Sequence, residues 1–119
     1  MKYQRIHKIS NMGDYLVNLV RVEFFKNVKK SEGCWIWTGG LNEEGPYGNF
    51  RWLGMVCLAH RLSYMLHFGD IQKRTDGENV CVCHRCDVPL CVRPDHLFLG
   101  TASDNMLDMV KKKRGRWNS

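Results

Sequence analysis

The chain has 119 residues, which suits one domain with a modest core, small enough that a structural metal would help it to fold. Eighteen Lys and Arg against twelve Asp and Glu leave a net charge of +6, which favours a polyanionic partner. No stretch approaches the roughly 20 apolar residues that a membrane span requires, and the first residues lack the apolar run of a signal peptide. We therefore expect a cytoplasmic protein, in whichever cell or infected host makes it, with no membrane attachment.

The N-terminal part of the chain predicts an arm followed by a helix. Residues 1–12 are polar and basic without a clear period, which indicates a loosely ordered arm. From Asp14 to about Lys30, apolar residues recur every three or four positions, as in an amphipathic helix with Asp14 as its N-cap. We expect this helix to pack on the core rather than to bind a phosphate through its terminal lysines.

Short strands are predicted in the middle of the chain. Cys34–Thr38 alternates in character, and further strands are expected at residues 47–50 and 52–56, broken at Gly54. The aromatic residues here are expected to lie in the core. Because a two-stranded ribbon can enter the major groove of DNA, Asn49 and Arg51 are the candidates for reading bases.

A second helix is predicted over Leu58–Phe68, and Gly69 ends it. Arg61 lies in its first turn, where a helix N-terminus favours anions, and this position suits a clamp for a backbone phosphate. A salt bridge from Arg61 to a nearby aspartate, Asp70 or Asp87, is the alternative. His60 is expected to be a hydrogen-bonded packing residue rather than a catalytic one.

The last third of the chain predicts a strand, a loop, a second strand and a helix. The apolar run Val80–Cys83 predicts a buried strand that leads into His84, and Leu97–Leu99 predicts the second strand. A capping-box pattern after Gly100 then opens a helix that carries Asn105 in its first turns. This order of elements places His84 and Asn105 near each other.

The loop between the two strands carries ligands for a metal ion. Cys86, Cys91 and His96 follow one another at even spacings of five. Zinc is the natural ion, because thiolate and imidazole ligands suit a tetrahedral site. A closed structural site needs a fourth protein ligand, and Cys34 is the best candidate, which would tie the first half of the chain to the second.

The remaining cysteines leave other interpretations open. Six cysteines in a short chain could form three disulfides in a secreted protein. The interleaved histidines and the lack of a signal peptide favour metal binding instead. Cys81 and Cys83 compete as ligands on spacing alone, although we expect them, like Cys57, to be small core side chains.

Taken together, these motifs resemble the ββα-metal signature of HNH and His-Cys box endonucleases, over roughly residues 22–114. The residues that carry the resemblance are His84, Cys86, Cys91, Pro94, His96, Leu97, Gly100, Thr101, Asn105 and Asp108. Upstream, the stretches similar to phage and intron-encoded homing endonucleases of that group are Gly33–Gly39, Tyr47-Gly48 and Ala59–Tyr64.

The resemblance implies an α+β fold with a ββα-metal core at about residues 80–113, a structural zinc, an added N-terminal helix and a small antiparallel sheet. It implies one nuclease domain over residues 13–114, with a C-terminal tail at 115–119. It also implies roles for three catalytic residues. His84 would be the general base, Asn105 the ligand of a catalytic divalent cation, and Arg61 the clamp for a backbone phosphate. The implied zinc ligands are Cys34, Cys86, Cys91 and His96.

Two positions depart from the family pattern. Arg93 stands before the loop proline, where the asparagine that gives HNH its middle letter usually stands, and its effect would fall on loop geometry. Cys83 stands before the histidine, where many HNH enzymes have an aspartate as a second metal ligand. We expect the arrangement of the His-Cys box relatives, in which the asparagine alone holds the cation.

The expected function is hydrolysis of phosphodiester bonds in double-stranded DNA. Magnesium suits the catalytic site, because it binds through few protein ligands together with substrate phosphates. The basic run after the last helix would add phosphate contacts, through Lys111, Lys112, Lys113 and Arg114. Because no second DNA-reading domain is expected, specificity would come from this module, doubled if two copies form a homodimer.

Two other functions remain open on the sequence. The first is a zinc-stabilised DNA-binding protein without catalysis, which would need neither His84 nor Asn105. The second is a thiol redox protein, because Cys83 and Cys86 have the spacing of a CxxC motif.

Overall fold

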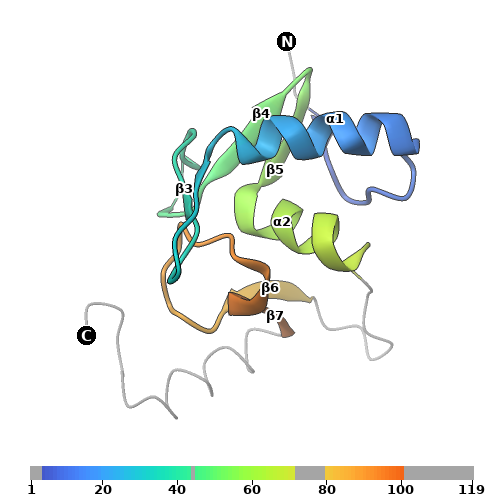
Figure 1. Ribbon diagram of the computed structural model, residues 1–119. Helices are drawn as coiled ribbons and strands as arrows, with labels where there is room; N and C mark the ends of the chain where they lie inside the picture. The colour runs from blue at the N-terminus through green and yellow to red at the C-terminus, as the bar shows by residue number, and fades with distance from the viewer. Residues whose placement is uncertain (1–3, 44, 72–79, 101–119) are drawn as a thin grey trace.

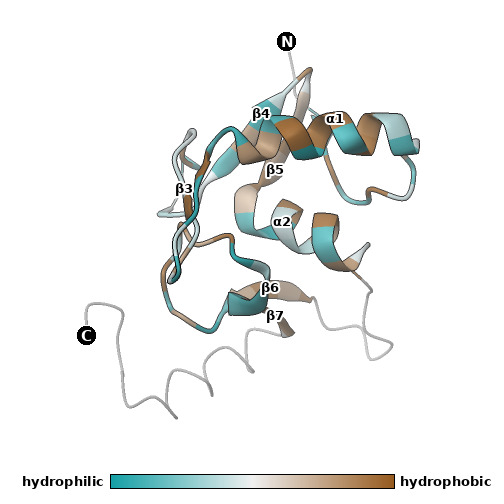
Figure 2. Ribbon diagram, viewed as in Figure 1, coloured by the Kyte–Doolittle hydropathy of each residue, from teal (hydrophilic) through white to brown (hydrophobic). Residues whose placement is uncertain are grey.

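The computed structural model describes residues 4–43, 45–71 and 80–100. In this part, two α-helices and small sheets form an α+β fold (Figure 1). No helix within these residues has the length and apolar character needed to cross a membrane. Hydrophobic and hydrophilic residues alternate along both helices, as expected for elements with one face on the core (Figure 2).

Helix α1 spans Asp14–Phe25 and packs through Val20 and Phe24, which are fully buried. Gly13, not Asp14, is its N-cap, and Asp14 lies in the first turn, where a carboxylate suits the positive end of the helix. The helix ends before the expected Lys30, because Val28–Lys29 form strand β2.

Strand β2 pairs antiparallel with β3, Ile36–Trp37. The chain turns between helix and strand at Asn27, whose Nδ2 donates to the Glu23 carbonyl at 3.2 Å and whose carbonyl accepts from Thr38 N at 2.7 Å. Backbone pairing therefore outcompetes a continued helix in this segment.

A three-stranded sheet lies beside α1, in the order β1-β5-β4. Strand β1 (Gln4–Arg5) runs parallel to β5 (Met55–Leu58), and β4 (Asn49–Trp52) runs antiparallel to it. The expected arm thus contributes two residues to a sheet. Strands β4 and β5 join through Leu53 and Gly54, both at positive φ (50° and 76°), as in a two-residue hairpin turn.

The core gathers between α1, the sheet and α2, which spans Ala59–Phe68. Phe24 packs against Trp37 and Phe50, with ring centroids 5.0 and 6.0 Å away. The expected core role of Trp37 and Phe50 is confirmed by their burial. Gly48 must be a glycine, because a Cβ there would lie 2.2 Å from the Trp37 ring.

Strands β6 (Cys81–His84) and β7 (Leu97–Gly100) form an antiparallel hairpin in which His84 pairs with Leu97. The loop between them returns to β3: Trp37 N donates to the Leu90 carbonyl at 2.8 Å, and Val92 N donates to the Trp35 carbonyl at 2.7 Å. A 3-10 turn, Pro94–His96, leads into β7. The hairpin matches the two strands expected for a ββα-metal core, whereas the expected helix after Gly100 lies outside the described residues.

Candidate functional site

Four side chains from distant segments converge on one point. Cys34 comes from the segment before β3, Cys86 and Cys91 come from the loop after β6, and His96 ends the 3-10 turn. Their ligand atoms all lie within 4.8 Å of one another, an arrangement that can hold a metal ion. The residues brought together are those that the sequence predicted, Cys34 included.

The cluster has the dimensions of a zinc site. Bond lengths of about 2.3 Å to sulfur and 2.0 Å to nitrogen place tetrahedral ligand atoms roughly 3.5–3.8 Å apart. Here His96 Nδ1 lies 3.7 Å from Cys34 Sγ and 3.4 Å from Cys91 Sγ. Burial raises the pKa of Cys34 to about 12, and the neighbouring Cys91 and Cys86 thiols add to the shift. Only a cation would stabilise several thiolates in this space.

Arg93 holds two of the ligand-bearing segments together. Its Nη1 donates to the carbonyls of Glu32 (2.5 Å) and Gly33 (2.7 Å), next to Cys34. Its Nε donates to Asp95 Oδ1 at 2.7 Å, next to His96. The residue that departs from the family pattern therefore makes the planar, forked contacts of a guanidinium between the two sides of the cluster.

Replacing Arg93 should loosen the cluster. We expect Arg93→Lys, which keeps the charge but loses the fork, to weaken zinc affinity by about 10-fold, and Arg93→Ala by up to about 100-fold, the range found when residues that support metal ligands are removed. Competition for zinc with a chromophoric chelator measures both. Lys29→Ala, an exposed lysine on β2, is the matched control. Unchanged zinc affinity in Arg93→Ala would contradict this role.

His84 ends strand β6 and lies outside the metal cluster. It is buried, and its Nε2 lies 3.0 Å from the Cys91 carbonyl oxygen. Because a carbonyl only accepts, Nε2 must carry the proton, and Nδ1 of the neutral ring is left as a base. Burial lowers the pKa of His84, although the hydrogen bond to Cys91 opposes the shift. The ring is therefore neutral near pH 7, in one fixed tautomer.

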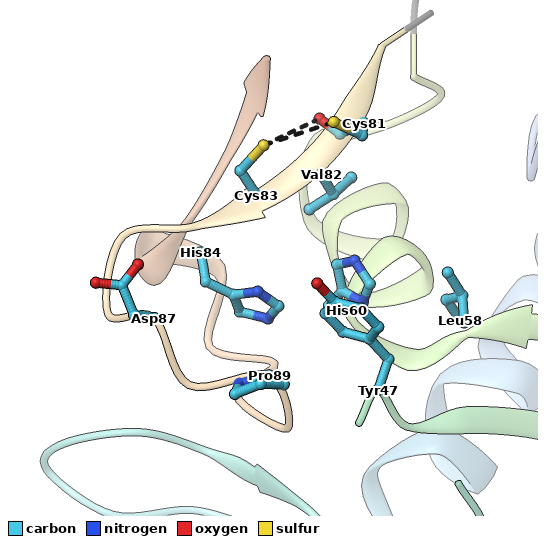
Figure 3. A pocket seen from close by; sticks show the side chains of 9 residues that line it. All are labelled: Tyr47, Leu58, His60, Cys81, Val82, Cys83, His84, Asp87 and Pro89. Atoms are coloured by element: carbon cyan, nitrogen blue, oxygen red, sulfur yellow. Dashed lines mark hydrogen bonds between the residues drawn. The ribbon is translucent and has the colours of Figure 1, made fainter. Parts of the chain in front are cut away.

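A pocket of about 220 Å³ opens beside His84. Figure 3 shows the side chains of His84 from β6 and His60 from α2 pointing toward each other, with Tyr47 beside His60. The three rings contact one another: centroids lie 4.8 Å apart for His60 and His84, 5.0 Å for Tyr47 and His60, and 6.0 Å for Tyr47 and His84. The pocket is lined by Tyr47, Leu58, His60, Cys81, Val82, Cys83, His84, Asp87 and Pro89.

Sequence reasoning missed the place of Tyr47 and His60 beside His84. The sequence predicts Tyr47 in the core, but this residue is only half-buried and lines the pocket. His60 is packed as expected, yet its buried Nδ1 has no hydrogen-bond partner among the described residues. No periodicity signals this contact, because it joins a helix to a strand far along the chain.

The buried His60 should make the fold sensitive to acid. Burial lowers the pKa of His60 from 6.5 to about 3, with the His84 ring adding to the shift. A depressed pKa means that the stability from neutral His60 is complete above pH 6.5 and is lost as the pH falls toward 3. Between pH 7 and pH 4 the loss amounts to about 3 kcal/mol.

Urea unfolding at pH 7, 5 and 4 measures this loss. We expect His60→Gln, which carries no titrating group, to lose about 3 kcal/mol less than the native chain over this range. Metal release on acidification affects both proteins and cancels in the comparison. His7→Gln, at an exposed histidine, is the control. Equal pH slopes for the native chain and His60→Gln would show that His60 does not titrate in this way.

The remaining predicted residues lie in different settings. Arg61 is half-buried in the first turn of α2; it makes no salt bridge with Asp70, whose Oδ1 instead accepts from Ile9 N at 2.8 Å and Ser10 N at 3.2 Å. Arg51 is exposed on β4, whereas Asn49 is buried. The other predicted residues lie outside the described part of the chain: Asn105, Lys111, Lys112, Lys113 and Arg114.

The cysteines decide between the open interpretations. All six are free thiols, so the disulfide framework is wrong. Cys81 and Cys83 are not part of the cluster; their sulfurs lie 3.6 Å from each other. Cys57 is buried, as expected of a core residue. Because Cys86 belongs to the cluster, the CxxC motif has no support as a redox pair.

Residues 57–107 match the HNH endonuclease family. This confirms the resemblance to HNH endonucleases over these residues. The matched stretch contains α2, His84, the loop of the metal cluster and both strands of the hairpin.

Two relatives come from Escherichia phage T7. Protein 2.8 is 36% identical over 99 residues, which cover 80% of this chain and 63% of the relative. Protein 7.7 is 40% identical over 84 residues, which cover 70% of this chain and 59% of the relative. The chain thus spans about three fifths of the length of these phage relatives. No solved structure matches the chain significantly.

Proposed function

We propose that the chain is a metal-dependent DNA endonuclease of the free-standing phage or homing type, which hydrolyses phosphodiester bonds in double-stranded DNA. The observation that carries the proposal is the setting of His84. Within a stretch that matches HNH endonucleases, its ring is buried, neutral and held in one tautomer by the Cys91 carbonyl. The same ring lines the pocket that opens beside β6.

We propose zinc as the ion of the Cys34, Cys86, Cys91 and His96 cluster. The donor set of three thiols and one imidazole and its spacing support this choice. Four protein ligands leave no open position for water, so the ion would be structural and not catalytic. Its binding would link the segment before β3 to the loop that follows β6.

His84 would act as the general base. Its Nδ1 can take a proton from a water molecule and so generate a hydroxide for attack on phosphorus. The Nε2–H group keeps its hydrogen bond to the Cys91 carbonyl during this step, and this bond keeps the ring aligned. Tyr47 and His60, both in ring contact with His84, limit its rotation.

We propose that Asn105 holds a catalytic divalent cation, with magnesium as the ion. When bound, such a cation stabilises the negative charge that builds on the leaving oxygen. A single carboxamide ligand implies weak binding to the free protein and tighter binding once DNA phosphates complete the coordination.

The proposed DNA contacts come from α2, the three-stranded sheet and the basic run after the last expected helix. Arg61 in α2 and the basic run Lys111–Arg114 would bind phosphates, and the sheet would lie in the major groove. With its amide oriented to donate to the Cys57 carbonyl at 3.2 Å, Asn49 accepts from Arg51 Nε at 3.2 Å. Asn49 would therefore support DNA binding by orienting Arg51. A homodimer and action in the host cytoplasm remain predictions.

Plasmid nicking tests the proposed base. We expect the zinc-loaded chain to nick supercoiled plasmid in magnesium. His84→Ala should nick about 10²- to 10⁴-fold more slowly, because a positioned general base contributes a rate enhancement of this size. His7→Ala, at an exposed histidine, should keep full activity. Zinc content and circular dichroism show whether each variant is folded. Equal nicking by a folded His84→Ala would refute the mechanism.

The cation ligand needs a separate test. We expect Asn105→Ala to remove the stimulation by magnesium while leaving zinc content and DNA affinity in the absence of magnesium unchanged, because the residue would touch only the catalytic cation. Asn105→Asp, which retains an oxygen ligand, should recover part of the rate. Nicking titrated against magnesium concentration measures both. An unaltered magnesium dependence in Asn105→Ala would assign the cation to other residues.

The alternative is a zinc-stabilised DNA-binding protein without catalysis. The departures at Arg93 and Cys83 are the features that favour it. Intact plasmid at all magnesium concentrations, together with retained binding to duplex DNA, would select this alternative.

A further inference from the structure

Arg5 lies in a row with Arg51 across the three-stranded sheet. In the observed register, Arg5 of β1 and Arg51 of β4 both pair with Val56 of β5. Cross-strand partners point to the same face of a sheet. The opposite face carries Phe50 and Cys57, which are buried in the core. Arg5 and Arg51 are both exposed and therefore lie on the outer face, one on each edge strand.

The outer face forms a polar groove. Its volume is about 420 Å³, and its lining residues are Arg5, Asn42, Glu43, Asn49, Arg51, Val56 and Leu58. Figure 2 shows β4 as more hydrophilic than the adjacent β5. Within this groove, the Asn49 amide accepts from Arg51 Nε at 3.2 Å when it is oriented to donate to the Cys57 carbonyl, and this contact helps to set the direction of that guanidinium. A guanidinium that is already oriented suits a partner with two hydrogen-bond acceptors at fixed positions better than it suits a single negative charge.

The distance between the Cα atoms of the two arginines is close to the rise of three base-pair steps in duplex DNA. Strands in a sheet lie about 4.8 Å apart, so two strand spacings separate the Cα atoms of Arg5 and Arg51 by about 10 Å. Successive base pairs rise by about 3.4 Å, so three steps also cover about 10 Å. Arginine pairs most often with guanine, through O6 and N7 in the major groove.

We propose that Arg5 and Arg51 read two guanines about three base pairs apart in the major groove of the bound DNA. The proposal rests on the proposed DNA-binding function and adds the specificity determinants to it. Arg5 belongs to a segment for which the sequence predicted only a loosely ordered arm. Its pairing with β5 gives that segment a fixed position beside Arg51.

Selection of bound sequences from a random duplex pool tests the proposal. The full zinc-loaded chain is used without magnesium, so that binding is measured apart from cleavage. We expect two preferred guanines, each favoured about 5- to 100-fold over other bases, as for a good bidentate contact. Arg51→Gln should relax the preference at one position, and Arg5→Gln at the other, about three base pairs away. Lys8→Gln, an exposed charge removed from the same segment, should leave both preferences intact.

Other outcomes overturn the proposal. If Arg5→Gln and Arg51→Gln weaken binding to all sequences equally and only reduce its salt dependence, both residues contact phosphates instead. Binding without base preference, or a preference that Arg5→Gln leaves unaltered, also excludes the reading role while the endonuclease function stands. A native chain that binds no duplex DNA would instead overturn the proposed function itself.

Discussion

Cys91 joins the two parts of the site. Its thiol belongs to the metal cluster, and its carbonyl oxygen accepts the hydrogen bond that fixes the tautomer of His84. Any ion that holds Cys91 in place therefore also holds the ring that would act as base. Backbone hydrogen bonds to Trp35 and Trp37 hold the loop between β6 and β7, and an ion bound at the cluster would add a cross-link to Cys34. Metal binding at the cluster and the proposed chemistry would thus be coupled through one residue.

Arg93 shows how a departure from a family pattern can be accommodated. An asparagine side chain at this position has the reach for local hydrogen bonds within the loop. The longer guanidinium instead spans to the Glu32 and Gly33 carbonyls while its Nε binds Asp95. These bonds link the two ligand segments directly, in addition to any metal ion that the cluster binds. Arg93 therefore supplies contacts that hold this loop against the segment before β3.

His60, beside His84, has a buried Nδ1 without a hydrogen-bond partner among the described residues, which lowers the stability of the fold. A buried imidazole nitrogen without a partner costs about 1–3 kcal/mol relative to a satisfied one. A hydrophobic residue at position 60 would avoid that cost. His60 instead packs its neutral ring against His84 and Tyr47, where it limits the rotation of the proposed base. Polar groups that are expensive to bury concentrate where function requires them.

Local patterns in the sequence determined much of this protein. The even spacing of Cys86, Cys91 and His96 and the apolar run before His84 predicted the metal loop and strand β6, because ligand spacing and alternation are properties of short segments. The end of α1 could not be predicted in this way, since Val28 and Lys29 pair with a strand that follows them. The same holds for the contact between His60 and His84, and for the alignment of Arg5 with Arg51. These features depend on which distant segments lie side by side, and only the tertiary structure decides that.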